Sequence, residues 1–571
     1  MTSKLKQASI SSFALGMNTR REDFNLRTKA GVFAREITNA DILKGGALRR
    51  RRGYTANLLA TAGHSLWADD GCAFYADGTA LIHLADGTPE LVATTIPGIT
   101  LDAGAPVAYA TAPDGGAYWT DGASVGQVAA LAAVELAPPQ PTAVPTASAV
   151  AGTTEPGRYT FCFTYVNAAG RESAATHPVA LTLTAAQALS LALAGLPPAG
   201  YALRVYLSQA NGETMYLADT FIAAGTKTLT SASPTGPVCQ TVGLASMPAG
   251  RLIRYNMGRL WVAAGPYLYY SPPYMPGLYD PVSGYIPFPA DITVLERIDG
   301  EGTFIVADQT YWLGDPTNSK ISAVSPLAAS MGSGCAARVT NDCYWMSPRG
   351  VVKGMPGGAI KLLQEDNVAP GATSAGTTVQ FDRGGIQVLM TAMLGTTVAV
   401  GGEGSSYASA EAADPAADGE VWLVNLGEEP ASYRYLSFPF SSFALIAGRL
   451  YGCKSDGVYL LEGATDNGEI VESVVDLGRQ DFGTPMIKRL ESAYAHASSE
   501  APLKLRITDD EGEGHTYASR RISERIAQMR FDVGRGKGGS FLAFALENCA
   551  GADFELAGVE LMAAVTSRRI R

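Results

Sequence analysis

Short runs of alternating apolar and polar residues recur along the chain, each followed by a tight turn and a second run. In one copy residues 258–265 lead into residues 267–272, and in another residues 448–453 lead into residues 457–462. Looser copies begin at three further positions: His64, Gly302 and Asp342. Alternation that ends in a tight turn is typical of a β-hairpin, so each unit predicts two paired strands.

Hairpins that recur at roughly 40–50 residues predict the blades of a β-propeller, because one blade alone cannot bury both of its faces. The repeat predicts about six to seven blades. Residues 401–419, rich in Gly, Ser and Ala, interrupt one repeat and predict a surface loop. A propeller is a platform that hosts many functions, so the repeat itself assigns none.

A Pro-rich linker at residues 137–145 breaks the blade pattern, which resumes at residue 247. Between them, a long alternating strand at 157–166, a turn at 168–173 and a strand at 202–208 follow one another in an order that resembles a fibronectin type III module. We therefore expect a sandwich inserted between two blades, with its ends close together. The last hundred residues alternate without the blade repeat and predict a separate C-terminal β-sandwich.

The predicted fold is all-β, a propeller with an inserted immunoglobulin- or fibronectin-like sandwich and a C-terminal sandwich. Its five parts are an N-terminal arm (1–54), the first blades (55–137), the insert (138–244), the remaining blades (245–465), and the C-terminal sandwich with a basic tail (466–571).

Composition agrees with this fold. The chain has 63 Gly and 32 Pro in 571 residues and is 17% charged, as expected for many short strands joined by turns. Its net charge of −11 argues against non-specific nucleic-acid binding, since DNA is itself an anion. No apolar run reaches the roughly 20 residues that span a bilayer, and the first residues lack a secretory signal, so neither membrane insertion nor secretion is expected.

Motifs that carry chemistry are sparse. The seven cysteines form no CxxC pair and are interpreted as reduced, buried residues, and the five histidines form no HExxH or HxH motif. We find no nucleophile elbow and no phosphate loop. The sequence therefore predicts no cofactor, no metal site and no catalytic residue.

Acidic residues offer two weaker candidates. The run at 509–513 lacks the spacing of a calcium loop and is interpreted as a hairpin turn between strands 504–508 and 515–519. Asp299, Glu301 and Asp308 lie in predicted turns and are the candidates for a glycosidase-like carboxylate pair.

Charged and aromatic clusters are the candidates for partner binding. The consecutive arginines Arg49, Arg50, Arg51 and Arg52, and the tail residues Arg568, Arg569 and Arg571, provide charge for contacts with acidic neighbours. The alternative for the first run is a loop that closes on Asp and Glu of the same chain. In the aromatic stretch 267–281, Tyr274 and Tyr279 are candidates for contact with a sugar or a protein, whereas Tyr267 and Tyr269 are interpreted as blade core.

Three segments together resemble phage tail proteins. "ADILKGGALRRRRGY" resembles the N-terminal segment of tail nozzle proteins of short-tailed phages and related tail-tip proteins. "GRLWVAAGPYLYYSPPYMPGLYDP" resembles their blade hairpin, and "FALENCAGADFELAGVELMAAVTSRRIR" resembles their C-terminal strand pair. The fibronectin-like insert departs from that pattern.

The resemblance implies a structural, non-enzymatic virion protein at the distal end of a tail, made in the bacterial host cytoplasm. Its implied partners are other tail proteins and further copies of itself around the tail axis, with the arginines docking on neighbouring subunits. It also implies that the protein guides DNA out without specific nucleic-acid binding. The alternatives are a receptor-binding protein that contacts a bacterial surface glycan or pilus, and a glycan-cleaving enzyme.

Overall fold

The computed structural model describes most of the chain, namely residues 5–69, 71–142, 146–193, 197–230, 234–317, 320–326, 336–339, 341–347, 349–368, 370, 375–394, 419–510, 512–533 and 538–565. Within these ranges every regular element is a strand, apart from the short 3-10 helices η1 (Asp23–Asn25) and η2 (Pro356–Gly358). The prediction of an all-β protein is confirmed. No helix in the described part is long and apolar enough to cross a membrane. The loop predicted at 401–419 lies almost wholly outside the described residues.

Four-stranded antiparallel meanders dominate the described chain. Two meanders precede the insert: β6 to β9 (Gly63–Asp69, Cys72–Asp77, Ala80–Asp86, Leu91–Thr95) and β10 to β13 (Ala108–Thr111, Ala117–Thr120, Val125–Ala129, Ala132–Val134). Three more follow the insert: β22, β23, β24 and β26 (Leu252–Asn256, Arg259–Ala264, Tyr267–Tyr270, Tyr285–Pro287), β27 to β30 (Val294–Ile298, Gly302–Val306, Thr310–Leu313, Ser322–Ser325), and β31 to β34 (Ala336–Val339, Asp342–Ser347, Gly350–Gly354, Ile360–Leu362). A short β21 (Ala245–Ser246) pairs with β25 (Leu278–Tyr279) beside the third meander.

The last two meanders involve the ends of the blade region. Strands β35 to β38 (Ala375–Arg383, Ile386–Leu394, Val421–Leu426, Ala431–Tyr435) begin a larger, nine-stranded sheet. Strands β39, β40 and β41 (Ser442–Ile446, Arg449–Lys454, Gly457–Leu460) are completed by β5 (Thr55–Leu59), which comes from the start of the chain. An early strand thus closes the final meander.

The two clearest copies of the predicted hairpin form as β23–β24 and β40–β41, and the turns that precede them, from β22 to β23 and from β39 to β40, are alike. Met257 and Gly258 both have positive φ angles (52° and 73°), and so do Ala447 and Gly448 (49° and 78°). Two consecutive residues with positive φ match a type I′ turn, whose twist suits a two-residue hairpin. Glycine at the second position adopts this conformation without the steric cost that a side chain would meet.

Neighbouring meanders meet through their first strands. Strand β31 contacts β27 and β35, and β39 contacts β35 and β6, while β10 contacts β22. The apolar faces pack between sheets: Phe304, Trp345 and Val352, all fully buried, form one such core between β28, β32 and β33. This burial supplies the main stabilisation of each pair of sheets.

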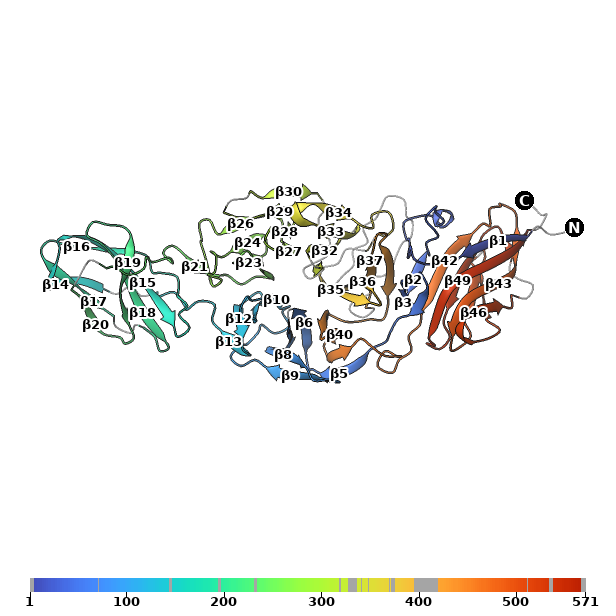
Figure 1. The fold of residues 1–571 in the computed structure, drawn as a ribbon, viewed down its shortest axis with the longest axis horizontal. Coiled ribbons are helices and arrows are strands. Elements are labelled where there is room, and N and C mark those ends of the chain that lie inside the picture. Colours follow the sequence, from blue (N-terminus) through green and yellow to red (C-terminus); the bar gives the residue numbers. More distant parts are fainter. Residues whose placement is uncertain are drawn as a thin grey trace. The chain divides into compact units, whose positions relative to one another are not determined.

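The N-terminal arm is built into the C-terminal region. One sheet joins β3 (Ala40–Ile42) and β4 (Leu48–Arg50) to β49 (Phe554–Val565), β43 (Lys488–Ser499) and β46 (Ser523–Phe531), with β1 (Leu5–Ile10) on β49 and β47 (Gly538–Gly539) on β43. The facing strands β42 (Val474–Gln480), β48 (Leu542–Glu547), β44 (Lys504–Thr508) and β45 (Gly514–Ala518) join the sheet of β35 to β38 through β2 (Glu36–Thr38). We call these two layers the terminal sandwich. Figure 1 shows its blue N-terminal strands among the red C-terminal ones.

Two compact units divide the chain: Met1–Thr95 with Thr293–Arg571, and Ile96–Ile292. The second unit holds the meanders of β10 to β13 and β22 to β26, and the inserted sandwich (Figure 1). The inserted sandwich has one sheet of β14 (Thr146–Thr154), β17 (Gln187–Ala192) and β20 (Thr226–Leu229) and another of β16 (Val179–Leu183), β15 (Gly157–Asn167), β18 (Tyr201–Ser208) and β19 (Met215–Phe221). Tyr159, Phe161 and Phe163 are buried in its own core.

Candidate ligand-binding cleft

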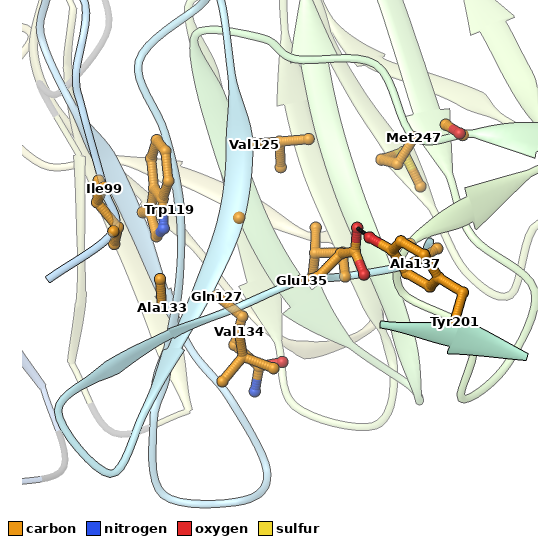
Figure 2. Close-up of a pocket in the computed structure, with 15 residues that line it drawn as sticks. Ile99, Trp119, Val125, Gln127, Ala133, Val134, Glu135, Ala137, Tyr201 and Met247 are labelled. Atoms are coloured by element: carbon orange, nitrogen blue, oxygen red, sulfur yellow. Dashed lines mark hydrogen bonds between the residues drawn. The ribbon is translucent and has the colours of Figure 1, made fainter. Parts of the chain in front are cut away.

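The inserted sandwich is fastened to the β10 to β13 meander by polar contacts. The Arg171 guanidinium donates to the Glu135 carbonyl and to the Gln127 side-chain oxygen, both at 2.7 Å. The Tyr201 hydroxyl donates to the Glu135 carboxylate at 2.8 Å, as Figure 2 shows. These contacts place the turn that carries Arg171 beside the last strand of the meander.

The local sequence explains the position of Arg171. The Asn167 side chain accepts from the amides of Ala169 (3.1 Å) and Arg171 (2.9 Å), and Gly170 takes a positive φ of 80°. Such an Asx-type turn holds the backbone in a fixed conformation. The predicted turn at 168–173 therefore becomes an attachment point.

A first cavity of about 520 Å³ lies on one side of these contacts (Figure 2). Trp119, which is 7% exposed, forms part of its wall, and the Trp119 indole nitrogen has no hydrogen-bond partner among the described residues. Gly126 gives the indole room, because a Cβ atom there would lie 2.8 Å from the ring. Gln127, Glu135 and Tyr201 also line this cavity, but they bond to one another or to Arg171, which leaves the Trp119 indole as its unpartnered donor among the described residues.

A second cavity of about 550 Å³, which we call the tyrosine cleft, lies between the same sandwich and the β10 to β13 and β22 to β26 meanders. Tyrosines from both meanders line one side, and an arginine, a glutamate and a tyrosine of the sandwich line the other. The residues used below are Tyr118, Tyr255, Tyr274, Glu172, Arg204 and Tyr206.

On the sandwich side, the Glu172 carboxylate is held by three donors. It accepts from the Tyr206 hydroxyl at 2.7 Å, from Arg204 at 3.0 Å and from the Thr164 hydroxyl. Burial and the carboxylate together raise the pKa of Tyr206. Burial disfavours the charge of Arg204, but the attraction of Glu172 prevails and raises the pKa of that guanidinium. The Arg204 guanidinium therefore stays charged, and these hydrogen bonds fix the orientation of both side chains.

On the meander side, Tyr118 and Tyr255 stack with ring centroids 5.5 Å apart and planes 30° apart. Burial raises the pKa of both phenols, so each stays protonated and able to donate. Tyr118 is 3% exposed as a residue, and it lines the cleft.

Tyr274 stands at the rim of the cleft and is 82% exposed. Its φ angle is 61°, a left-handed conformation that costs a bulky residue about 1–2 kcal/mol. Its amide donates to the Gly258 carbonyl at 2.7 Å, and its ring lies over Gly258, where an added Cβ would be 3.3 Å from the ring. Strain of this kind gathers at functional sites, which makes Tyr274 the best placed of the predicted residues.

The other predicted tyrosines lie outside this cleft. Tyr279 is partly buried and packs edge-on against Tyr269, with centroids 5.3 Å apart. The interpretation of Tyr267 as core is wrong, since that residue is 42% exposed at the end of β24. Tyr267 and Tyr285 form a small surface aromatic pair at 6.1 Å.

The arginine run contacts acidic groups of its own chain. Arg49 pairs with Glu555 at 2.8 Å and Arg51 with Asp466 at 2.6 Å, while Arg50 and Arg52 lie 3.6 and 3.7 Å from Asp553 and Glu462. Arg50 and Arg51 are buried, but the side chains of Arg49 and Arg52 remain 50% and 66% exposed. Their docking on a partner stays a prediction. Arg568, Arg569 and Arg571 lie outside the described residues.

The acidic candidates are engaged locally. Asp299 pairs with Arg297 at 3.2 Å, Glu301 accepts from the Gly357 amide at 2.9 Å, and Asp308 accepts from the Tyr311 hydroxyl at 2.8 Å. The 509–513 run turns between β44 and β45, so its prediction as a hairpin turn is confirmed. Across the described residues no group of three His, Cys, Asp or Glu side chains is placed to hold a metal ion.

Sequence reasoning missed one pair of groups beside the cleft. Cys162 on β15 and Cys239, next to the cleft residue Gln240, are both buried, and their sulfur atoms are 3.8 Å apart. The hydrogen bond from the Cys162 thiol lowers the pKa of Cys239 to about 7. Nothing in a spacing of 77 residues signals this proximity.

Comparisons with known proteins give no family. No family model and no curated protein matches the chain. Among solved structures, the extracellular domain of a one-component system from B. thetaiotaomicron is 7% identical with a TM-score of 0.24, covering 93% of each chain. The sialidase of Trypanosoma rangeli is 9% identical with a TM-score of 0.20, covering 99% of this chain and 96% of its own. Likenesses this weak carry no argument about activity.

Proposed function

We propose that the protein is a structural component of a phage tail, at the nozzle or tail tip, that assembles with further copies of itself and other tail proteins. One observation carries the proposal beyond the sequence resemblance. Two of the three segments that resemble tail proteins, although some 500 residues apart, pair strand to strand: Leu48 faces Leu556 and Arg49 faces Glu555. The two resembling segments therefore belong to one structural element, which supports the proposal.

The proposed architecture is a propeller of seven blades, one for each four-stranded meander, that carries the inserted sandwich. Adjacent first strands and a last meander completed by the early strand β5 support it, because propellers place first strands innermost and often complete a blade with strands from both ends of the repeat region. Such a platform suits a virion part that transmits force and holds neighbours in register.

The experiment that tests this function is electron microscopy of intact particles labelled with an antibody against residues 140–243. Label at the distal tip of a tail supports the proposal. Absence of label on particles, with the epitope shown to be accessible on the purified protein, overturns it. A second arm uses the double variant Arg49→Glu, Arg52→Glu, which reverses the two exposed arginines; docking through them predicts loss of incorporation from a protein that still folds.

A second candidate function, receptor binding, is favoured by a different observation. The strained, exposed Tyr274 stands over a cleft that the inserted sandwich helps to form. The entry and exit of the insert meet at one residue, since Gln140 donates to the Ala175 carbonyl at 2.6 Å and the Ala175 amide donates to Thr241 at 3.1 Å. Removal of residues 140–243 is therefore expected to leave particles intact and to impair attachment. Unchanged adsorption by such particles would count against this role.

The third reading, a glycan-cleaving enzyme, gains no specific support here. Asp299, Glu301 and Asp308 are each committed to a local contact. The expectation that the protein is not an enzyme stays a prediction, and loss of a labelled polysaccharide on incubation with the pure protein would contradict it.

A further inference from the structure

We propose that the tyrosine cleft binds a neutral saccharide. The inference rests on the receptor-binding role proposed above and names the chemistry of the ligand. It stands on three properties of the cleft: an open aromatic platform, polar groups that match hydroxyls, and charged side chains that already have protein partners.

The aromatic platform is Tyr274. One face of its ring rests on Gly258, which leaves the other face open at the rim of the cleft. Proline at positions 272, 273 and 276 and the hydrogen bond from the Met275 amide to the Pro272 carbonyl (3.3 Å) restrain the loop that carries it. The C–H groups on one side of a pyranose ring carry partial positive charge and pack on the negative face of an aromatic ring. A platform that is already rigid loses little entropy when a sugar settles on it.

The polar groups suit hydroxyls. The Tyr118 hydroxyl is both a donor and an acceptor on a residue that lines the cleft, and a sugar hydroxyl matches it in both roles. The Arg204–Glu172 pair offers a fixed donor next to a fixed acceptor, and vicinal hydroxyls present the matching pattern. A cavity of about 550 Å³ is of the size that small ligands occupy.

The partners of the charged side chains favour a neutral ligand. Arg204 is paired with Glu172 at 3.0 Å. Arg171 reaches a carboxylate through Gln127, whose amide donates to Asp114 at 2.7 Å. Because both arginines that line the cleft already donate to protein acceptors, an anionic sugar would have to displace one of these bonds, and it would also meet the Glu172 carboxylate.

The test uses the full chain and ligand-detected NMR. The probes are neutral hexose and N-acetylhexosamine oligosaccharides, a matched set of uronate-containing oligosaccharides, and a set of unrelated peptides. We expect contacts from members of the neutral set only. The variant Tyr274→Ala is expected to weaken binding about tenfold or more, and Tyr118→Phe, which keeps the ring, a few-fold.

The matched control is Tyr285→Ala, which removes a tyrosine that is 38% exposed in the same meander but does not line the cleft. It should bind as the unaltered protein does, and thermal melts should show that all three variants are folded. Absence of binding to every neutral oligosaccharide, preference for the uronate or peptide set, or binding that Tyr274→Ala leaves unchanged would each overturn the inference.

The outcome is separable from the tail function. Label on phage tails without saccharide binding would leave the structural role standing and remove this site. Saccharide binding lost in Tyr274→Ala, with no label on particles, would establish the site on a protein that is not a tail component.

Discussion

The terminal sandwich takes strands from both ends of the chain, whereas the inserted sandwich is built from residues 146–229 alone. The first shares one continuous core with the meander of β35 to β38, and the second has a core of its own. Burial that spans several elements makes each of them depend on the others, while a separate core lets a sandwich fold independently. We therefore regard the terminal sandwich as the scaffold of this molecule and the inserted sandwich as a separate module.

Buried charge marks the same difference. Arg51, 1% exposed, donates to both oxygens of Asp466 at 2.8 and 2.6 Å and to Asn39 at 2.9 Å, and its guanidinium lies 4.9 Å from the Phe438 ring centre. Arg171, which holds the inserted sandwich, is only half-buried and bonds to a carbonyl and an amide. Loss of either partner in the Arg51–Asp466 pair would leave a buried group unpaired, whereas water can replace the hydrogen bonds that Arg171 makes.

The largest expected effect comes from deletion of residues 1–54. It removes β1 to β4, so β49 loses its neighbours β1 and β4, and β42 loses β2. We expect little soluble protein and no cooperative thermal transition, because exposed edges and a divided core remain. Soluble yield and circular dichroism melts measure this.

The matched deletion replaces residues 140–243 with a short Gly/Ser linker. Its melting temperature should stay within about 3 °C of the full chain's, since the insert does not share the terminal core. The contrast between scaffold and module is wrong if the variant that lacks residues 1–54 melts cooperatively like the full chain. It is also wrong if the variant without the insert fails to fold.

The next effect is that of Arg51→Ala. Its removal leaves Asp466, which is 7% exposed, as a buried charge without its partner. Loss of one member of a buried ion pair costs about 3–5 kcal/mol of unfolding free energy. Urea denaturation followed by tryptophan fluorescence measures the change. The control Arg52→Ala removes an arginine that is 66% exposed and should cost less than about 1 kcal/mol.

Local features of this fold could be predicted from the sequence. Alternation and turn signals place the hairpins at 258–272 and 448–462, which form as β23–β24 and β40–β41, because both signals lie within about fifteen residues. The turn at 509–513 follows for the same reason.

Long-range pairings could not be predicted in that way. Arg51 meets Asp466 across 415 residues, and Cys162 meets Cys239 across 77. Alternation says which side chains share a face of a strand, but not which sheet covers that face. The exposure of Tyr267 could not be predicted for this reason, and neither could the residues that line the cleft together with Tyr274.

A smaller effect than loss of Arg51 is expected from oxidation of the Cys162 and Cys239 pair. The Cys239 thiolate attacks oxidised glutathione and releases one glutathione thiolate; Cys162, after losing its proton, then attacks the mixed disulfide and releases the second. Since the hydrogen bond from Cys162 lowers the pKa of Cys239, its thiolate forms at a lower pH than that of an ordinary cysteine, and the first step should accelerate as the pH rises toward the ordinary thiol range. A bond across 77 residues is expected to stabilise the inserted sandwich by about 2–4 kcal/mol.

Peptide mass spectrometry without reductant measures this bond, and Cys239→Ser is the control that should show neither the linkage nor the rise in melting temperature. Oxidation of other cysteines in its place, with this pair still reduced, would contradict the prediction.

The smallest expected effect tests how the module is held. Arg171→Ala removes the two hydrogen bonds to Glu135 and Gln127 and should cost about 1 kcal/mol, since water reaches this half-buried group and takes over part of the bonding. Hydrogen–deuterium exchange should rise in the peptide that covers residues 125–137, while β15, in the separate core, stays protected. The control Arg158→Ala removes an exposed arginine of the same sandwich and should leave both regions unchanged. Faster exchange in β15 would mean that the inserted sandwich depends on its attachment, and the distinction between module and scaffold would then be one of degree.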